Sequence, residues 1–415
     1  MITLFPLLTL TATVRIGWSC PVLSWYLYHI NRAVFMVYSQ TVSPCLFIEY
    51  RCSEYNTMIN YYIIVTCACL AYYLCTYIYR GIPIENSINQ STATDQSHHN
   101  NDSNQHKTNK RVIVITGCDY GGLGYQLVNQ LLSSHYPFHI IACHYNNQCK
   151  QLIELAQQYN CADRLHTVQL DLLSDESIQY ACKQITSIVH TPGIYSLINN
   201  AASNTGWLSE FTNIQTYKNV MQVNLFGLIQ FTHLLLPHIK QYSGGELSRI
   251  ININSFYGTI STFSQSAYAA SKHALHAYTT ALRQELCSFN VYVISCDMGT
   301  MDTTMIHTTQ QSMTSIYTHI NNQQLSEQYG TTYQLCIQRA VMLMKLLAAN
   351  PCRYAHQIVH NTIIAKYPAA RTVYGMDAMI MIYTYAFIPL WLYDIAVLKF
   401  IGNPKPDSVK LSVVK

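Results

Sequence analysis

Short apolar runs alternate with longer helical patterns from Arg111 onward. Six runs have the length and composition of strands: RVIVIT, FHIIAC, LHTVQLD, IYSLIN, RIININS and VYVISCD. Helical patterns separate them, the first two beginning near Tyr125 and Gln148. Strands that alternate with helices indicate a parallel sheet covered by helices on both faces. We therefore predict an α/β fold with a doubly wound parallel sheet.

An uncharged run precedes this alternation. Residues 61–79 read YYIIVTCACLAYYLCTYIY and are followed directly by Arg80. A run of this length can cross a bilayer as a helix, and tyrosines at both ends are typical of membrane interfaces. We predict a membrane anchor helix at 58–80, with a buried core helix as the alternative. The flanking charges are too balanced to orient the helix across the bilayer.

Composition divides the rest of the chain. Residues 81–110 are polar and almost free of apolar side chains, so we interpret them as a flexible linker. Residues 1–57 start with an apolar stretch that lacks a basic leading region, and we assign them as an uncertain N-terminal extension. Residues 111–345 then form the predicted α/β domain, and residues 346–415 form a C-terminal segment.

The C-terminal segment contains a second apolar stretch. Residues 378–393 are apolar, but Pro389 interrupts them, so they are too short and broken to be predicted as a transmembrane helix. We interpret the stretch as a segment that dips into the membrane or covers a substrate. A core helix of an enlarged substrate lobe is the alternative.

Charge and cysteine usage exclude two classes of function. The formal net charge is +4 and the basic residues are scattered, so nucleic-acid binding is not expected. The 15 cysteines contain no CxxC pair, so no metal site is expected. Cysteines that replace small apolar residues suit reduced thiols in a domain that faces the cytosol.

Residues able to carry chemistry follow the predicted strands in order. The first strand ends in the glycine-rich turn TGCDYGGLG, where phosphate oxygens could approach the backbone at a helix N-terminus. Such a turn alone is also compatible with a purely structural role. Later strands and helices supply Asp171, Asn199, Asn224 and Ser255. Tyr268 and Lys272 lie four residues apart and therefore share one helix face.

Taken together, residues 111 to about 305 resemble the short-chain dehydrogenase/reductase family. The family pattern is a TGxxxGxG turn, NNAG, a helix asparagine, a serine, YxxxK, and Pro-Gly with a later threonine. This chain reads TGCDYGGLG, NNAA, Asn224, Ser255, YAASK, and Met298-Gly299 with Thr303. The glycine turn thus has one extra residue, and alanine and methionine replace a glycine and a proline. No catalytic group is lost by these departures.

The resemblance implies a Rossmann-like catalytic domain at 111–345 that transfers hydride between a nicotinamide and an alcohol or carbonyl carbon. Tyr268 would be the general acid/base, Lys272 would lower its pKa and bind the cofactor ribose, Ser255 would hold the substrate oxygen, and Asn224 would hold a water. The implied catalytic residues are Asn224, Ser255, Tyr268 and Lys272. The implied cofactor contacts are Thr116, Gly117, Gly121, Gly122, Gly124, Asp171, Asn199, Ala201, Tyr268, Lys272, Gly299 and Thr303.

The second strand bears on the choice of cofactor. An acidic residue at its end would favour NAD, and a basic one would accommodate the extra phosphate of NADP. The sequence there is ACHYNNQCK, which has no acid but contains Lys150. We therefore expect NADP or NAD as cofactor, with NADP favoured.

The C-terminal segment bears on the substrate. The stretch YPAARTVYGMDA resembles that of the retinol and hydroxysteroid dehydrogenase branch, through Pro368, Arg371, Gly375, Asp377 and Ala378. This implies a lipophilic alcohol or carbonyl substrate, of steroid or retinoid type. The alternatives are a 3-hydroxybutyrate dehydrogenase, an acyl-dihydroxyacetone-phosphate reductase, or a catalytically silent nucleotide-binding sensor. The anchor implies a membrane location in the endoplasmic reticulum, with mitochondria as the alternative, and the resemblance allows a homodimer.

Overall fold

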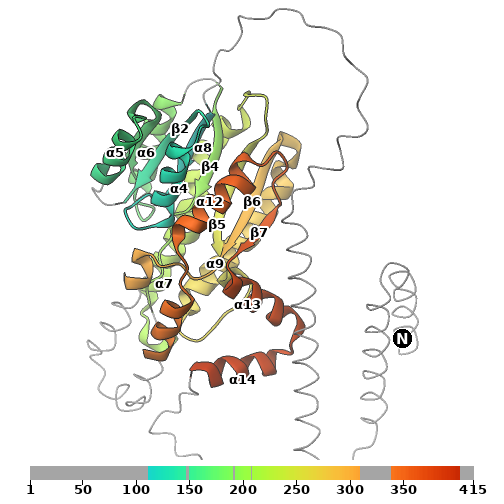
Figure 1. Ribbon diagram of the computed structural model, residues 1–415. Helices are drawn as coiled ribbons and strands as arrows, with labels where there is room; N and C mark the ends of the chain where they lie inside the picture. Colours follow the sequence, from blue (N-terminus) through green and yellow to red (C-terminus); the bar gives the residue numbers. More distant parts are fainter. Residues whose placement is uncertain (1–110, 146–148, 190–191, 207, 309–337, 402–415) are drawn as a thin grey trace, which may run out of the picture. The chain divides into compact units, whose positions relative to one another are not determined.

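A parallel sheet of seven strands lies at the centre of the described part of the chain (Figure 1). The computed structural model describes residues 111–145, 149–189, 192–206, 208–308 and 338–401. The strands are β1 Arg111–Ile115, β2 Phe138–His144, β3 Leu165–Gln169, β4 Ile194–Asn199, β5 Ser248–Ser255, β6 Val291–Met298 and β7 Arg371–Tyr374. Their order is β3-β2-β1-β4-β5-β6-β7, and every adjacent pair is parallel. The predicted doubly wound α/β fold is confirmed.

Helices cover both faces of the sheet, as Figure 1 shows. One face is packed by α4 Leu123–Ser133, α5 Cys149–Gln158 and α12 Pro351–Ile358. The other is packed by α6 Asp175–Ile188, α8 Gly227–Lys240 and α9 Ser266–Leu286. The shorter segments are η1 Ala162–Arg164, η2 Ser209–Phe211, α7 Ile214–Met221, η3 Gln222–Phe226, η4 Phe256–Gly258, η5 Cys287–Phe289 and η6 Val359–Ile364. The chain order reverses between β1 and β4, which is where open sheets of this kind bind ligands.

The two faces of β5 and β6 differ in polarity toward their carboxyl ends. Between the buried Arg249 at the start of β5 and Ser255 at its end, the residues that point toward α4 and α12 are apolar: Ile251, Ile253, Ile294, Cys296 and Met298. The alternate residues point toward α9, because successive side chains of a strand face opposite sides. These begin with Ile250 and Val293 but continue as Asn252, Asn254, Ser295 and Asp297, all buried. We call these last four residues the polar layer.

One helical stretch among the described residues is long and apolar enough to cross a membrane, Ile214–Lys240. Its residues Phe231, Leu235 and Ile239 are fully buried against the sheet. We therefore interpret it as a core helix. The predicted extension at 1–57, anchor at 58–80 and linker at 81–110 lie outside the described residues.

The C-terminal segment is partly built into the sheet, so the predicted boundary at 345 does not separate two units. Strand β7 pairs with β6, and α12 packs against α4. Strand β5 is tied to the same segment, because the buried Arg249 donates to the carbonyls of Thr362 and Ile363 at the end of η6. A strand of four residues, RTVY, has too little apolar periodicity to be found from sequence.

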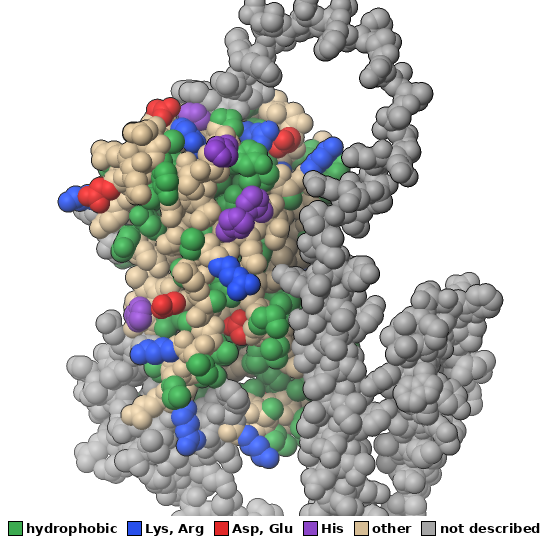
Figure 2. Space-filling model, viewed as in Figure 1, with side chains coloured by type: hydrophobic (Ala, Val, Ile, Leu, Met, Phe, Trp, Pro, Cys, Tyr) green, Lys and Arg blue, Asp and Glu red, His purple; other side chains and the backbone are tan. Residues whose placement is uncertain are grey.

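The apolar stretch at 378–393 forms parts of two helices, α13 Met376–Phe387 and α14 Leu390–Ile401. Pro389 separates them because proline cannot donate a helical hydrogen bond. Ala378, Ile382 and Tyr393 pack on Phe256 and Ile260, beside the active-site end of β5. Met381, Tyr385, Ile388 and Val397 are partly buried against this cluster. Seven large apolar side chains of the two helices are exposed: Met376, Ile380, Phe387, Leu390, Trp391, Ile395 and Leu398. Apolar side chains gather over this region in Figure 2.

Candidate active site

A cavity of about 580 Å³ opens at the carboxyl ends of the strands. Segments that follow β1, β2, β3 and β4 line it at one end. The ends of β5 and β6, the start of α9 and residues 300–306 line it at the other. Most of the residues predicted for the site therefore meet in one place, as expected where parallel strands end at the same edge of a sheet.

The glycine-rich turn connects β1 to α4. Gly117 and Gly121 have φ angles of +69° and +80°, which side-chain-bearing residues rarely adopt. A Cβ on Gly124 would lie 2.2 Å from the Gly117 carbonyl oxygen, so α4 can approach the turn only with glycine there. Gly122 directly precedes α4, which has no side-chain cap. The first-turn amides of α4 are thus available for an anion such as a phosphate.

The second asparagine of NNAA holds this turn in place. Asn200 donates from its side-chain amide to the carbonyls of Thr116 and Gly117, at 2.9 and 3.0 Å. The Thr116 hydroxyl accepts from the backbone amides of Asn200 and Ala201, both at 3.0 Å. Sequence reasoning had singled out Asn199, whose side chain instead donates to the Thr232 and Asn252 side chains below the cavity. Asn199 does not line the cavity, whereas Asn200 does.

Ser255, Tyr268 and Lys272 converge at the other end of the cavity. Ser255 ends β5, and its hydroxyl accepts from the Tyr257 backbone amide at 3.3 Å and acts on the pKa of Tyr268, the third residue of α9. The Lys272 ammonium lies 5.7 Å from the centre of the Tyr268 ring. It donates to the Ile253 carbonyl at 3.0 Å.

Burial dominates the electrostatics of the pair. It raises the pKa of Tyr268, an effect that the Ser255 hydrogen bond opposes. It also lowers the pKa of Lys272 to about 8, against the attraction of Asp297. Burial therefore sets the direction of the Tyr268 shift in this arrangement, and the lowering effect expected of Lys272 stays a prediction. Desolvation disfavours the charged form of each group and is the largest cause of each shift.

Asn224 joins the site through its neighbours. It is fully buried in the π-helical turn η3, and its side-chain amide donates to the Ser203 carbonyl and the Ser271 hydroxyl, each at 2.9 Å. Its side-chain oxygen accepts from the Ser203 backbone amide at 2.7 Å. The Ser271 hydroxyl in turn donates to the Tyr268 carbonyl. The side chain of Asn224 thus ties the loop after β4 to the first turn of α9.

The remaining predicted contacts lie at the two ends of the cavity. Asp171 lines it just after β3 and accepts from the backbone amide of Leu173 at 2.8 Å. Gly299 and Thr303 line it after β6. The Asp377 carboxylate accepts from the Thr300 backbone amide at 2.7 Å and lies so close to Gly299 that a Cβ there would clash with it. Asp377 was known from sequence only as part of a C-terminal pattern.

Comparison with known proteins identifies the family. The model of the short chain dehydrogenase family matches residues 111–314. The chain belongs to this family. Retinol dehydrogenase 16 of Homo sapiens is 27% identical over 288 residues, which are 68% of this chain and 86% of that protein. The 17-beta-hydroxysteroid dehydrogenase type 6 of Bos taurus is 28% identical over 301 residues, 71% of this chain and 90% of the relative.

Two further similarities have narrower scope. The mitochondrial D-beta-hydroxybutyrate dehydrogenase of Bos taurus is 31% identical over 191 residues, which span 46% of this chain and 54% of that one. A short-chain dehydrogenase from Streptomyces avermitilis has a TM-score of 0.53 at 19% identity, covering 70% of this chain and 96% of its own, which shows the shared fold.

As a short-chain dehydrogenase, the protein is an NAD(P)-dependent oxidoreductase that acts on a CH–OH group. The cavity fits a dinucleotide of this kind, because the uncapped start of α4 lies at one end and Tyr268 at the other. Among the described residues, no cluster of histidine, cysteine or carboxylate side chains could hold a metal ion.

Proposed function

We propose that the protein interconverts a lipophilic alcohol, of steroid or retinoid type, and its carbonyl by hydride transfer. The observation that carries this proposal is the convergence of Ser255, Tyr268 and Lys272 at one end of a cavity whose adjoining wall is apolar. That wall includes Tyr257, Met298, Met301, Met305, Ile306 and Met344. Methionine side chains adapt their shape readily, which suits a rigid apolar ligand.

Tyr268 is the proposed proton donor and acceptor. Because burial raises its pKa, the phenol is protonated at neutral pH and ready to give its proton to a carbonyl oxygen. The hydride for the carbonyl carbon would come from a nicotinamide bound in the cavity, which would accept it in the reverse direction. Ser255 would donate to the same oxygen, and the Lys272 ammonium would stabilise the phenolate that remains. The product of reduction is the alcohol, and the reverse reaction returns the proton to Tyr268.

The charges around the cavity favour a neutral substrate. Among the described lining residues Lys272 is the one cation, and Asp119 and Asp171 are the acids. A 3-hydroxybutyrate or an acyl-dihydroxyacetone phosphate would bring a carboxylate or phosphate that needs a further cation. The D-beta-hydroxybutyrate dehydrogenase resembles less than half of this chain. Both anionic substrates, 3-hydroxybutyrate and an acyl-dihydroxyacetone phosphate, remain alternative proposals.

We further infer that the cofactor is NAD rather than NADP, which reverses the sequence-based expectation. Asp119 of the glycine-rich turn lines the cavity, and its carboxylate accepts from the backbone amide of Tyr145, which directly follows β2, at 3.1 Å. An acid beside the end of the second strand accepts from ribose hydroxyls and repels a 2′-phosphate. The acid was missed because it comes from the first turn, not from the second strand.

Cofactor binding tests this inference. We expect the full chain to bind NADH more tightly than NADPH, as measured by the fluorescence of the reduced nicotinamide. Asp119→Ser should narrow the difference, chiefly by strengthening NADPH binding. Glu154→Ser, on the exposed side of α5, is the matched control and should leave the ratio unchanged. Tighter NADPH binding by the unaltered chain would contradict the inference.

We also propose a membrane location, in the endoplasmic reticulum with mitochondria as the alternative. The exposed apolar side chains of α13 and α14 support it, as does the uncharged run at 61–79. Cell fractionation and microscopy of the tagged full chain test the location. Recovery in the soluble fraction would refute it.

Turnover of a substrate panel tests the proposed reaction. The full chain in detergent is assayed with NAD and NADP against retinol, a 17-hydroxysteroid and 3-hydroxybutyrate, and with reduced cofactor against the corresponding carbonyls. We expect turnover of a steroid or retinoid. Tight cofactor binding with no turnover on the whole panel would instead favour a silent nucleotide-binding sensor.

The role of Tyr268 is tested on whichever substrate is turned over. Tyr268→Phe should lower kcat/KM by about 10²- to 10⁴-fold, the usual contribution of a general acid/base, and leave cofactor affinity nearly unchanged. Tyr278→Phe makes the same chemical change on the same helix, away from the cavity, and should retain turnover. Comparable activity of the two variants would refute the assignment.

A further inference from the structure

A buried carboxylate lies beneath the active-site helix without touching the cavity. Asp297 belongs to the polar layer on β6 and is fully buried. Its two oxygens accept from the Ser295 hydroxyl at 2.7 Å and from the Arg371 Nε at 2.6 Å. A buried carboxylate is costly unless it is paired and hydrogen-bonded, and this one is both.

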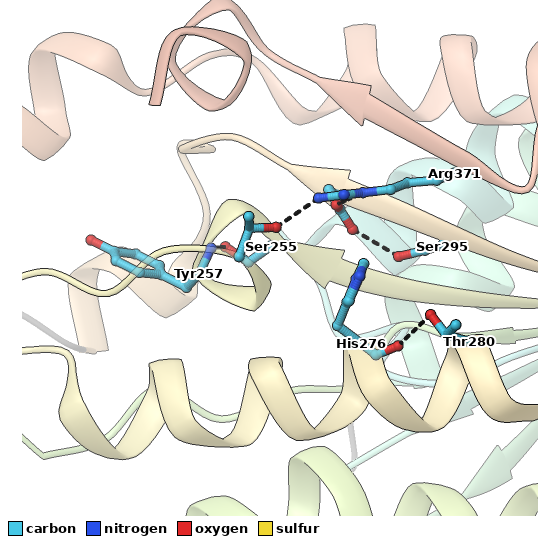
Figure 3. Close-up of polar contacts among 8 residues, drawn as sticks. Ser255, Tyr257, His276, Thr280, Ser295 and Arg371 are labelled. Atoms are coloured by element: carbon cyan, nitrogen blue, oxygen red, sulfur yellow. Dashed lines mark hydrogen bonds and ion pairs between the residues drawn. The ribbon is translucent and has the colours of Figure 1, made fainter. Parts of the chain in front are cut away.

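The partner of Asp297 comes from the C-terminal segment. Arg371 is the first residue of β7, and its guanidinium also donates to the Thr259 hydroxyl at 2.6 Å. Figure 3 shows the Arg371 side chain over the carboxyl ends of the strands, with Ser295 below it. Arg371 belongs to the same C-terminal sequence pattern as Asp377, but it does not line the cavity and has no role in the proposed proton transfer.

The active-site helix faces this ion pair. Helix α9 packs on β6, and Lys272 and His276 lie four residues apart on it, so they share a face. In Figure 3 the His276 ring rises from α9 toward Arg371. Asp297 attracts the protons of both Lys272 and His276, and Arg371 opposes protonation of His276. The Lys272 ammonium donates to the Ile253 carbonyl on β5, and Asp297 lies opposite Asn254 on the neighbouring strand β6, against which α9 packs.

We propose that Asp297, held by Arg371, is a positioning residue that keeps Lys272 in its ammonium form within a buried site. The inference rests on the proposed role of Lys272. The two residues have opposite effects on the Lys272 ammonium: the Asp297 carboxylate stabilises it, and the Arg371 guanidinium weakens that stabilisation. The C-terminal strand thereby acts on the electrostatics of the site from outside the cavity.

Competitive labelling measures this effect without a substrate. The full chain is treated with trace acetic anhydride across a pH series, and acetylation of Lys272 is followed by mass spectrometry against the exposed Lys150 in the same sample. Asp297→Asn should lower the pH midpoint of Lys272 labelling by about one unit or more, the size expected for loss of a nearby opposite charge. Arg371→Gln should raise the midpoint, and the double variant should lie between the single variants.

Ser295→Ala is the matched control. It removes a hydrogen bond to Asp297 but no charge, so the midpoint should stay close to that of the unaltered chain. An unchanged midpoint in Asp297→Asn would overturn the proposal, as would an equal downward shift in Ser295→Ala, which would indicate general loosening. Should Asp297→Asn fail to fold, the direction of the Arg371→Gln shift decides, and a downward shift refutes the proposal. Because labelling needs no turnover, the result is independent of the proposed reaction.

Discussion

The two sides of strands β5 and β6 have the same backbone but opposite chemistry. The side under α4 and α12 is apolar as far as Ile253 and Met298, and Ile251 there is fully buried in the core. The side under α9 changes from Ile250 to the polar layer as the strands approach the cavity. The sequence RIININS encodes both, because residues alternate between the faces of a strand.

The difference teaches how the fold separates stability from chemistry. Apolar packing is non-directional and tolerates neighbours of several shapes, whereas each buried polar group needs a partner. Asn252 has such partners, because its side chain accepts from Asn199 and donates to Thr279, both at 2.9 Å. Asn254 lines the cavity, and its amide makes no hydrogen bond within the described residues. Within the polar layer, Asn252 below the cavity thus has its hydrogen-bond partners, whereas Asn254 at the cavity has an amide that a ligand could bind.

The largest expected effect comes from the apolar side. Ile251→Ala should lower the free energy of unfolding by about 4 kcal/mol, because it removes buried methyl groups and leaves a cavity. Cofactor affinity of the folded fraction should not change, since Ile251 does not line the site. Urea titration followed by circular dichroism measures the loss. The matched control is Ile214→Ala, where the side chain is 70% exposed. An equal loss of stability in this variant would show that burial on the apolar side is not the cause.

An apolar substitution in the polar layer should also destabilise the protein. Asn252→Leu adds apolar volume but leaves the buried side chains of Asn199 and Thr279 without this hydrogen-bond partner. The free energy of unfolding should fall by about 3 kcal/mol for the two groups. Replacing all three by apolar residues of similar size should recover part of the loss, because no buried group is then left unpaired. The same urea titration compares the single and triple variants. A more stable single variant would show that the layer needs no polar partners.

Sequence patterns predicted six of the seven strands and their alternation with helices. Runs such as RVIVIT are long enough and apolar enough to be found singly, and the spacing of Ser255, Tyr268 and Lys272 follows from one strand and one helix. Their meeting in one cavity follows from the parallel sheet. These features depend on residues that are close along the chain.

Features that depend on distant residues were missed or misassigned. Strand β7 is defined by its pairing with β6, not by its own pattern. Asn199 and Asn200 are adjacent in sequence, and only the packing of the turn shows which of them holds it. Asp119 reaches the end of β2 from another loop. Burial raises the pKa of Tyr268, and a sequence does not show how deeply a side chain is buried.

The smallest predicted effect is a pH dependence of the free energy of unfolding, which Lys272 on the α9 side should cause and Ile251 on the other side should not. Burial lowers the pKa of Lys272 from 10.5 to about 8, so below pH 8 both folded and unfolded chains carry its proton and the cost of burial is fully present. Between about pH 8 and 10 the folded chain loses that proton first, the unfolded chain binds more protons, and the free energy of unfolding should rise by about 2 kcal/mol. Above that range Tyr268, whose pKa is raised, acts in the opposite direction. Lys272→Met should flatten the rise, whereas Ile251→Ala should shift the whole curve without changing its slope. If the free energy of unfolding still rises with pH in Lys272→Met, another titrating group causes the rise.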